Sequence, residues 1–329
     1  TKTGILVMFE LLNEGQMAAL VGGMGGVLLG LAARIGRFCT LGAIEDYLYA
    51  NSQTRLRMWG LSIGVAMFAV FAMLGAGLFD PTRTAYLAMH WNPIYSIIGG
   101  VMFGYGMALS GNCGYGALAR LGGGDLRSFV IVLVAGISAF VVMSGPLAAV
   151  RVMIFPVNEI TDQSVPSIAY LLAAGLPISA PAIGMAIAII ITLITFWGDN
   201  FHRERKAIFW SIVVGIAIAG GWAGTQWIAD HGFASPDIRS HTFVAPVGDT
   251  ILYAMNGSAL GLNFAIGSVA GVIAGAFLGS MIKGHFRWEA CEDPRELRRQ
   301  IIGAAIMGVG AILAFGCSVG QGITAFSVL

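Results

Sequence analysis

The stretch IGGVMFGYGMALSGNCGYGAL, residues 98–118, decides how this chain folds. It lies within residues 84–119, a run of 36 residues without an Asp, Glu, Lys or Arg. A helix needs only about 20 apolar residues to cross the hydrocarbon core of a bilayer. The run is therefore too long for one span, and its excess follows Gly111 and Asn112, residues typical of a helix break. The stretch predicts a membrane-spanning helix that continues into a re-entrant half-helix.

The composition of the whole chain places it in a membrane. Of its 329 residues, 57% are hydrophobic and 11% are charged, whereas soluble globular proteins carry about 25% charged residues. Glycine is abundant, at 47 residues, which favours close packing of membrane helices. A net charge of +1 offers no basic surface for a nucleic acid and excludes it as a partner. The composition indicates an all-α, polytopic integral membrane protein.

Charge-free runs predict eight spans, at about residues 15–34, 57–79, 92–110, 128–150, 179–198, 207–228, 264–282 and 300–316. Within the segment that joins the fourth and fifth spans, SIAYLLAAGL (167–176) is too short to cross and predicts an interfacial helix. The chain stops at Leu329 within an apolar run, which leaves open whether a ninth helix follows.

The Lys and Arg residues predict the orientation, because cytoplasmic loops are enriched in both. With the amino terminus outside, four of them fall in outer loops: Lys2, Arg83, Arg151 and Arg239. The other fourteen fall in cytoplasmic loops: Arg34, Arg37, Arg55, Arg57, Arg120, Arg127, Arg203, Arg205, Lys206, Lys283, Arg287, Arg295, Arg298 and Arg299. This bias predicts an outer amino terminus.

Three segments repeat one pattern around a cysteine: MGGVLLGLAARIGRFCTLGAI (24–44), residues 98–118, and AAIMGVGAILAFGCSVGQGIT (304–324). Each is a Gly-spaced span that reaches a polar break and a Cys, with Gly three positions later. The third copy runs opposite to the first two, as in transporters built from inverted repeats. The pattern predicts one transport domain over 1–329, with repeat halves at about 15–150 and 179–329 joined by an outer segment, 151–178. A fourth unit, without a Cys, is expected around 256–267.

Cys39, Cys113 and Cys317 are the candidate functional residues, because each marks a helix break and non-helical backbone is expensive at membrane depth. They form no CxxC and have no nearby His, so no metal template is matched. Asn112, Ser318 and Gln321 adjoin them and are further candidates for substrate binding. The fourth cysteine, Cys291, lies in a charged loop and is expected to be incidental.

The chemistry of these breaks favours a soft anion. Burial raises the pKa of a thiol above its usual value of about 8.5, so buried cysteines stay neutral and do not repel an anion. Sulfur is a soft ligand, suited to a soft metal or to a sulfur-bearing solute. A broken helix also exposes N–H groups that favour negative charge. A sulfur-containing anion would suit both the soft thiols and the exposed N–H groups.

Charged residues near the motifs have two interpretations. Arg34, Arg37 and Arg120 either attract an anion or anchor helix ends at the cytoplasmic interface. The nearby acidic residues are expected to cap helices or pair with these arginines; they are Glu45, Asp46 and Asp125. The loop at 229–249 contains two His and three Asp residues but no metal-binding spacing, and is expected to be a solvated loop.

The motifs GRFCTLGAIEDYLY (36–49), SGNCGYGALARLGGGDLRS (110–128) and FGCSVGQGITAFS (315–327) resemble the cysteine signatures of the YeeE/YedE family of sulfur-compound transporters. The resemblance covers the chain from about residue 15 to its end. It implies an hourglass-like helical fold in the bacterial inner membrane, without cofactor or enzymatic activity. It also implies that a thiosulfate-type anion passes between Cys39, Cys113 and Cys317 by S–H···S contacts. Family members are associated with a small cytoplasmic sulfurtransferase-like partner.

Two other classes of protein stay open. A membrane thiol–disulfide oxidoreductase would need a close cysteine pair with a depressed pKa. A soft-metal channel for Cu(I) would be expected to place Met clusters near each Cys, and none of the three motifs does. A sulfur-anion pathway accounts better for three separate Cys–Gly breaks.

Overall fold

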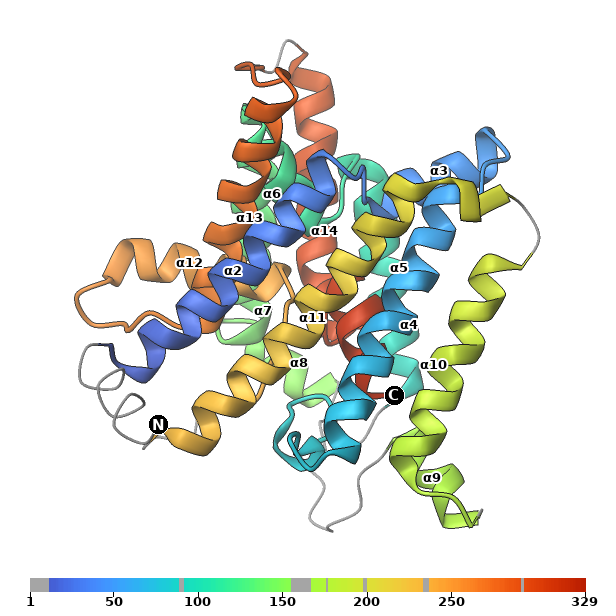
Figure 1. Cartoon of the computed structure of the whole chain (residues 1–329). Helices are drawn as coiled ribbons and strands as arrows, with labels where there is room; N and C mark the ends of the chain where they lie inside the picture. The colour runs from blue at the N-terminus through green and yellow to red at the C-terminus, as the bar shows by residue number, and fades with distance from the viewer. Residues whose placement is uncertain are drawn as a thin grey trace.

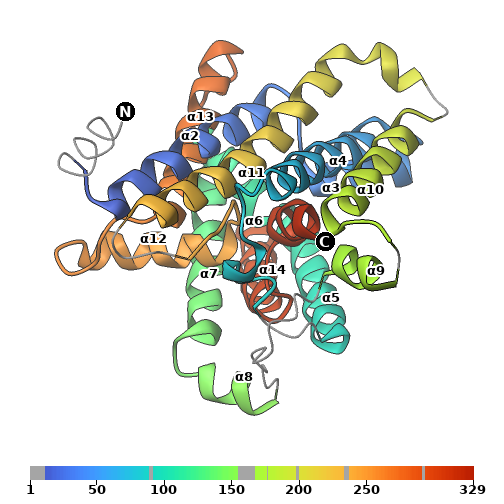
Figure 2. The same cartoon turned by 60° about the horizontal axis from the view of Figure 1, so that its bottom comes forward.

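The protein is an all-α bundle of long, tilted helices interrupted by short ones (Figure 1). The computed structural model describes residues 12–88, 92–154, 167–175, 177–197, 200–232, 237–290 and 293–329. Within these ranges there is no β-strand, and only two isolated bridges occur, Thr84–Ile238 and Asp125–Glu289. In both views the C-terminal segment, drawn in red, lies in the middle of the bundle (Figures 1 and 2). The predicted all-α fold is confirmed.

In chain order the α-helices are α2 (Glu14–Arg34), α3 (Thr40–Tyr49), α4 (Thr54–Gly75), α5 (Pro93–Ser110), α6 (Gly114–Gly122), α7 (Leu126–Met143), α8 (Ala148–Ile154), α9 (Ile168–Gly175), α10 (Ala180–Phe196), α11 (Arg205–His231), α12 (Val244–Asn256), α13 (Phe264–Ile282) and α14 (Pro294–Leu313). Short turns of tighter or wider helix are η1 (Pro81–Arg83), η2 (Asn200–Arg203), the π-helix η3 (Gly320–Ala325) and η4 (Phe326–Val328).

All eight predicted spans coincide with long helices: α2, α4, α5, α7, α10, α11, α13 and α14. By length and composition, six described segments can cross a membrane, one of them comprising α5 and α6 together. Helix α10 has 17 residues and passes the same test only together with α9, from which it is bent by 118°. Helix α14 falls short because its first turns carry Arg295, Glu296, Arg298 and Arg299.

Helix starts follow from the sequence. Asn13 and Gln16 form a capping box at the start of α2. Asn92 caps α5, and Pro93 follows at the first helical position. A proline has no N–H, but at this position the helix has no carbonyl to accept one. Asp125 caps α7 through the N–H of Arg127. These polar residues satisfy backbone donors that would otherwise be exposed at the ends of membrane helices.

Glycines bring α2 and α13 into close contact. Gly22, Gly26 and Gly30 recur every fourth residue along α2, and each faces the backbone of α13 without room for a Cβ atom. Gly267, Gly271 and Gly275 of α13 face the backbone of α2 in the same way. Gly106 of α5 likewise meets the backbone of α14 at Met307. The expectation that the glycines serve close helix packing is confirmed.

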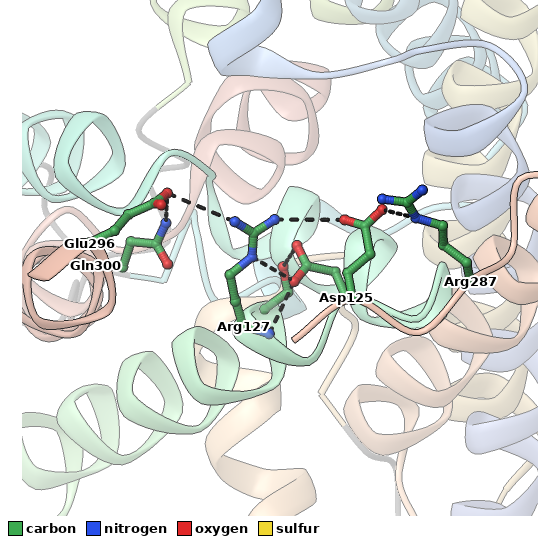
Figure 3. A network of polar contacts seen from close by, with 7 residues as sticks. Asp125, Arg127, Arg287, Glu296 and Gln300 are labelled. Atoms are coloured by element: carbon green, nitrogen blue, oxygen red, sulfur yellow. Dashed lines mark hydrogen bonds and ion pairs between the residues drawn. The ribbon is translucent and has the colours of Figure 1, made fainter. Parts of the chain in front are cut away.

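A polar network joins the start of α7 to the start of α14 (Figure 3). Arg127 lies 3.2 Å from Asp125, 3.7 Å from Glu289 and 3.9 Å from Glu296. Arg287 adds a contact of 2.8 Å to Glu289. Asp125 thus acts as helix cap and as partner of an arginine, as expected from the sequence.

The loop between α11 and α12 differs from its prediction. It was expected to be solvated, but His241 is fully buried and its Nδ1 lies 2.6 Å from Ser268 Oγ on α13. Its backbone carbonyl accepts a hydrogen bond from Thr324 near the C-terminus. The loop therefore enters the bundle. At 256–267, where the sequence predicts a fourth unit, residues 257–262 connect α12 to α13, whereas residues 237–243 precede the short helix α12.

Candidate functional site

The three cysteine motifs share a backbone feature that places the cysteine. Two residues before each Cys, the chain adopts a left-handed conformation: φ is 58° at Arg37, 72° at Gly111 and 59° at Phe315. Such a residue ends a helix, because the chain leaves the helical path there. For Arg37 and Phe315 the conformation is strained, since a Cβ atom disfavours it. A left-handed residue therefore follows the last residue of α2, α5 and α14 within three positions and lies two positions before Cys39, Cys113 and Cys317.

Cys113 is the most enclosed of the three. It is fully buried and is the N-cap of α6, where its Sγ accepts the N–H of Gly116 at 3.3 Å. The hydroxyl of Thr40 lies 3.9 Å from the same sulfur. Ser318 also approaches this thiol, and its buried Oγ has no hydrogen bond of ordinary length. Cys113 is thus surrounded by one amide and two hydroxyl groups.

Cys317 has the same kind of surroundings on a different backbone. It is 2% exposed, and its Sγ accepts the N–H of Gly320 at 3.4 Å. The hydroxyl of Thr242, from the loop before α12, lies 3.7 Å from this sulfur. The chain then continues into the π-helix η3 rather than a regular α-helix.

Cys39 differs from both buried thiols. It is the N-cap of α3, but its side chain makes no capping hydrogen bond. It is partly exposed and contributes to the wall of a cavity. Its thiol is therefore the one that solvent or solute in this cavity can reach.

The three cysteines form a series. All are free thiols; the hydroxyl of Thr40, which follows Cys39, lies 3.9 Å from Cys113 Sγ, and Ser318, which follows Cys317, approaches the Cys113 thiol. The hydroxyls of Thr242 and Tyr86 both lie beside Gly320, whose N–H donates to Cys317 Sγ. The order is therefore Tyr86 and Thr242, then Cys317, Cys113, Cys39 and the cavity. Among the described residues, no group of three or more His, Cys, Asp or Glu is arranged to hold a metal ion.

The cavity beside Cys39 is cationic. It has a volume of about 360 Å³, and its basic lining residues are Arg34, Arg37, Arg55, Arg120, Lys283 and His285, against a single acid, Glu45. Three of the cations have partners: Arg34 donates to Ser280 at 2.7 Å, Lys283 donates to the Ile35 carbonyl at 3.1 Å, and Arg55 lies 3.1 Å from Asp46. Within the described ranges, Arg37 and Arg120 form no ion pair. An anion that leaves Cys39 would enter a positive potential.

The other predicted site residues, Asn112, Ser318 and Gln321, lie in three different environments. Asn112 is 3% exposed and lines the cavity next to Cys39. Ser318 directly follows Cys317, and its hydroxyl approaches the Cys113 thiol. Gln321 turns back on its own break, where its Nε2 donates to the Phe315 carbonyl at 3.0 Å. Cys291 lies outside the described residues.

Sequence reasoning missed Thr40, Thr242 and Tyr86. Thr40 could have been noticed, because it directly follows Cys39 in the first motif. Thr242 and Tyr86 carry no such signal, because they lie in loops that have no cysteine motif. Only the fold brings them to Cys317.

Comparison with known proteins identifies the family of this chain. The profile of a family described as "Sulphur transport" matches residues 35–329. A protein named "Thiosulfate transporter TsuA" from Spirochaeta thermophila is 25% identical over 312 residues, which cover 91% of this chain and 88% of the relative. A protein of the same name from Escherichia coli is 24% identical over 310 residues, covering 91% of this chain and 84% of the relative. With nearly its whole length matched, the chain belongs to the sulphur transport family.

Proposed function

We propose that this protein takes up thiosulfate across the bacterial inner membrane and releases it unchanged into the cytoplasm. The anion would pass from Cys317 to Cys113 to Cys39 through S–H···S contacts and leave through the cationic cavity. Asn112, Ser318 and Gln321 are the neighbouring residues proposed to assist binding. The observation that carries the proposal is the series of three free thiols, two of them beside threonine hydroxyls, that ends at a cationic cavity.

The chemistry of thiosulfate matches this series. Its terminal sulfur is soft and polarizable, and a neutral thiol can donate to it without repelling its charge. In Cys113 and Cys317 the sulfur already accepts an N–H, which leaves the S–H proton available for a ligand. Both TsuA relatives are named for thiosulfate, which supports the same substrate here.

The orientation follows from the positive-inside rule. Arg34, Arg37, Arg120 and Lys283, which the sequence assigns to cytoplasmic loops, all line the cavity beside Cys39. With the amino terminus outside, the cavity would face the cytoplasm and Tyr86 would face outward. A small sulfurtransferase-like protein that takes thiosulfate from the cavity is the partner we expect.

The architecture we propose is a single transport domain built from inverted repeat halves, at about 15–150 and 179–329. Helix α2 packs against α13 and α5 against α14, so each half supplies one helix to each pair. Each thiol and the hydroxyl that faces it come from the same half, Thr40 and Cys113 from the first and Thr242 and Cys317 from the second, which supports two halves of similar construction.

Thiosulfate labelled in only one of its two sulfur atoms tests the proposal. Purified protein in proteoliposomes should import label from the terminal sulfur and from the sulfonate sulfur at equal rates, and empty liposomes should import neither. Label from the terminal sulfur that stays bound to protein, without the sulfonate, would identify a thiol-based enzyme instead. The absence of uptake by verified, folded protein would refute the transport proposal.

A further inference from the structure

Two threonines have an unusual environment for a membrane protein. A Thr hydroxyl in a membrane helix ordinarily bonds a backbone carbonyl one turn earlier. Thr192, Thr195 and Thr250 do so at 2.7–2.9 Å. The hydroxyls of Thr40 and Thr242 instead face a thiol, at 3.9 and 3.7 Å.

These contacts recur at both buried cysteines and combine the same groups. At each site there is one thiol, one threonine hydroxyl and one backbone N–H three residues after the Cys. Both threonines are partly exposed, whereas the cysteines they face are buried. At each site the residue that carries the hydroxyl is therefore more accessible to a solute than the sulfur.

We infer that Thr40 and Thr242 are specificity-determining residues that bind the oxygen atoms of the transported anion while the adjacent thiol contacts its terminal sulfur. This inference rests on the proposed function and deepens it. Each thiol–threonine pair offers a soft group beside a hard one. It therefore selects an anion that carries a soft sulfur and hard oxygens in one molecule.

The energetics favour an exchange of partners on binding. Sulfur is a weak hydrogen-bond partner for a hydroxyl. A sulfonate oxygen is a strong one, because hydrogen bonds to charged groups are shorter and stronger than neutral ones. Thr40 and Thr242 give up little when they turn from the thiol to the anion, whereas a threonine bonded to a carbonyl would give up a stronger bond.

The packing around Thr242 keeps this hydroxyl accessible. A Cβ atom on Gly320 would lie 2.5 Å from Thr242 Oγ1 and 3.3 Å from the Tyr86 hydroxyl. Glycine at position 320 therefore leaves space for both hydroxyls beside Cys317. Tyr86 gives this site a second hydroxyl, as Ser318 does for the site of Cys113.

The pairing of a thiol with a threonine hydroxyl predicts which anions the protein selects. Sulfate has hard oxygens but no exposed sulfur for the thiol, and hydrosulfide has a soft sulfur but no oxygen for the threonine. Neither should compete well with thiosulfate for the wild-type protein.

Paired substitutions at Thr40 and Thr242 separate hydrogen bonding from packing. Valine keeps the shape of threonine and removes the hydroxyl, whereas serine keeps the hydroxyl and removes a methyl group. If the hydroxyls bind the anion, Thr40→Val and Thr242→Val should each raise the KM for thiosulfate about tenfold or more, as expected for a lost hydrogen bond to a charged group. Thr40→Ser and Thr242→Ser should stay within about threefold of wild type. Thr250→Val, at a threonine that bonds the Pro246 carbonyl, is the matched control.

A second readout does not depend on transport. The infrared S–H stretching band should shift in Thr40→Val and Thr242→Val and stay unchanged in Thr250→Val, because only the first two remove a group that contacts a thiol. Valine variants with wild-type KM, or serine variants that fail while valine variants work, would overturn the inference and leave the proposed function intact. A wild-type protein that imports no thiosulfate would refute both.

Discussion

The breaks at Cys113 and Cys317 present the same chemistry on two different backbones. Each sulfur accepts an N–H from three residues later, at 3.3 and 3.4 Å, and each faces a threonine hydroxyl. The first break passes through Gly111 into the regular helix α6, whereas the second passes through Phe315 into the π-helix η3. The backbone differs and the polar groups do not, which supports the proposal that the thiol, hydroxyl and amide bind the anion.

The difference between the breaks lies in strain. Glycine adopts the left-handed conformation at little cost, whereas phenylalanine does not. A π-helix is also rare and is found mostly at functional sites. The Cys317 break is thus the strained one and the Cys113 break the relaxed one, and substitutions should affect them differently.

Removal of a thiol should have the largest effect. We expect Cys113→Ala to abolish thiosulfate flux, because this cysteine is the middle member of the series and has no substitute nearby. Cys113→Ser should also fail, because a harder oxygen is a poorer partner for sulfur than a thiol is. Cys39→Ala and Cys317→Ala should impair flux strongly. Labelled-thiosulfate uptake at equal expression measures all four.

The control for this series is Cys291→Ala, which should transport like wild type. Normal flux in Cys113→Ala would refute passage along thiols, even if the protein still transported thiosulfate.

The second-largest effect should come from a methyl group added by Gly→Ala substitution, which is expected to lower flux more at the Cys317 break than at the Cys113 break. At Gly320 a Cβ atom would approach Thr242 Oγ1 to 2.5 Å, whereas at Gly116 the nearest atoms, Asn112 Oδ1 and Cys113 Sγ, would lie at 3.4 and 3.6 Å. We expect Gly320→Ala to lower flux about tenfold, since Thr242 must move, and Gly116→Ala to lower it by about threefold or less. Uptake rates per folded transporter provide the test. Equal losses in the two variants would show that the Thr242 contact is unimportant.

Charge in the cavity should have a smaller effect that depends on salt. Arg37 and Arg120 line the cavity, and the double substitution Arg37→Gln, Arg120→Gln should lower flux severalfold at low ionic strength. The loss should shrink at high salt, because ions screen exposed charges beyond about 10 Å at 0.1 M. Arg37→Lys, Arg120→Lys keeps both charges and serves as control. A loss that is independent of salt would favour helix anchoring as the role of these arginines.

The sequence allowed prediction of the helices and of the thiols, for identifiable physical reasons. Spans need long charge-free runs, and the predicted 264–282 coincides with α13. The Cys–x–x–Gly spacing predicted the breaks because each buried Cys sulfur accepts the backbone N–H of that glycine. Thr242 and the burial of His241 were not predictable, since both depend on a polar loop that enters the bundle through contacts distant in sequence.

The smallest effects should come from the residues that end the helices, and their signs should be opposite. Gly111 has φ of 72° and open space around a Cβ atom, so Gly111→Ala adds strain without a clash and should destabilise the protein by about 1 kcal/mol. Phe315→Gly should relieve strain at φ of 59° and change stability by about 1 kcal/mol or less in the favourable direction, because the greater freedom of glycine in the unfolded chain offsets part of the gain. Gly104→Ala is the matched control, since Gly104 lies within α5, the helix that Gly111 caps, also has open space, and is not left-handed. It should stabilise the protein slightly, as alanine does within a helix. Unfolding in detergent measures all three, and destabilisation by Phe315→Gly comparable to that of Gly111→Ala would mean that the two breaks do not differ in strain.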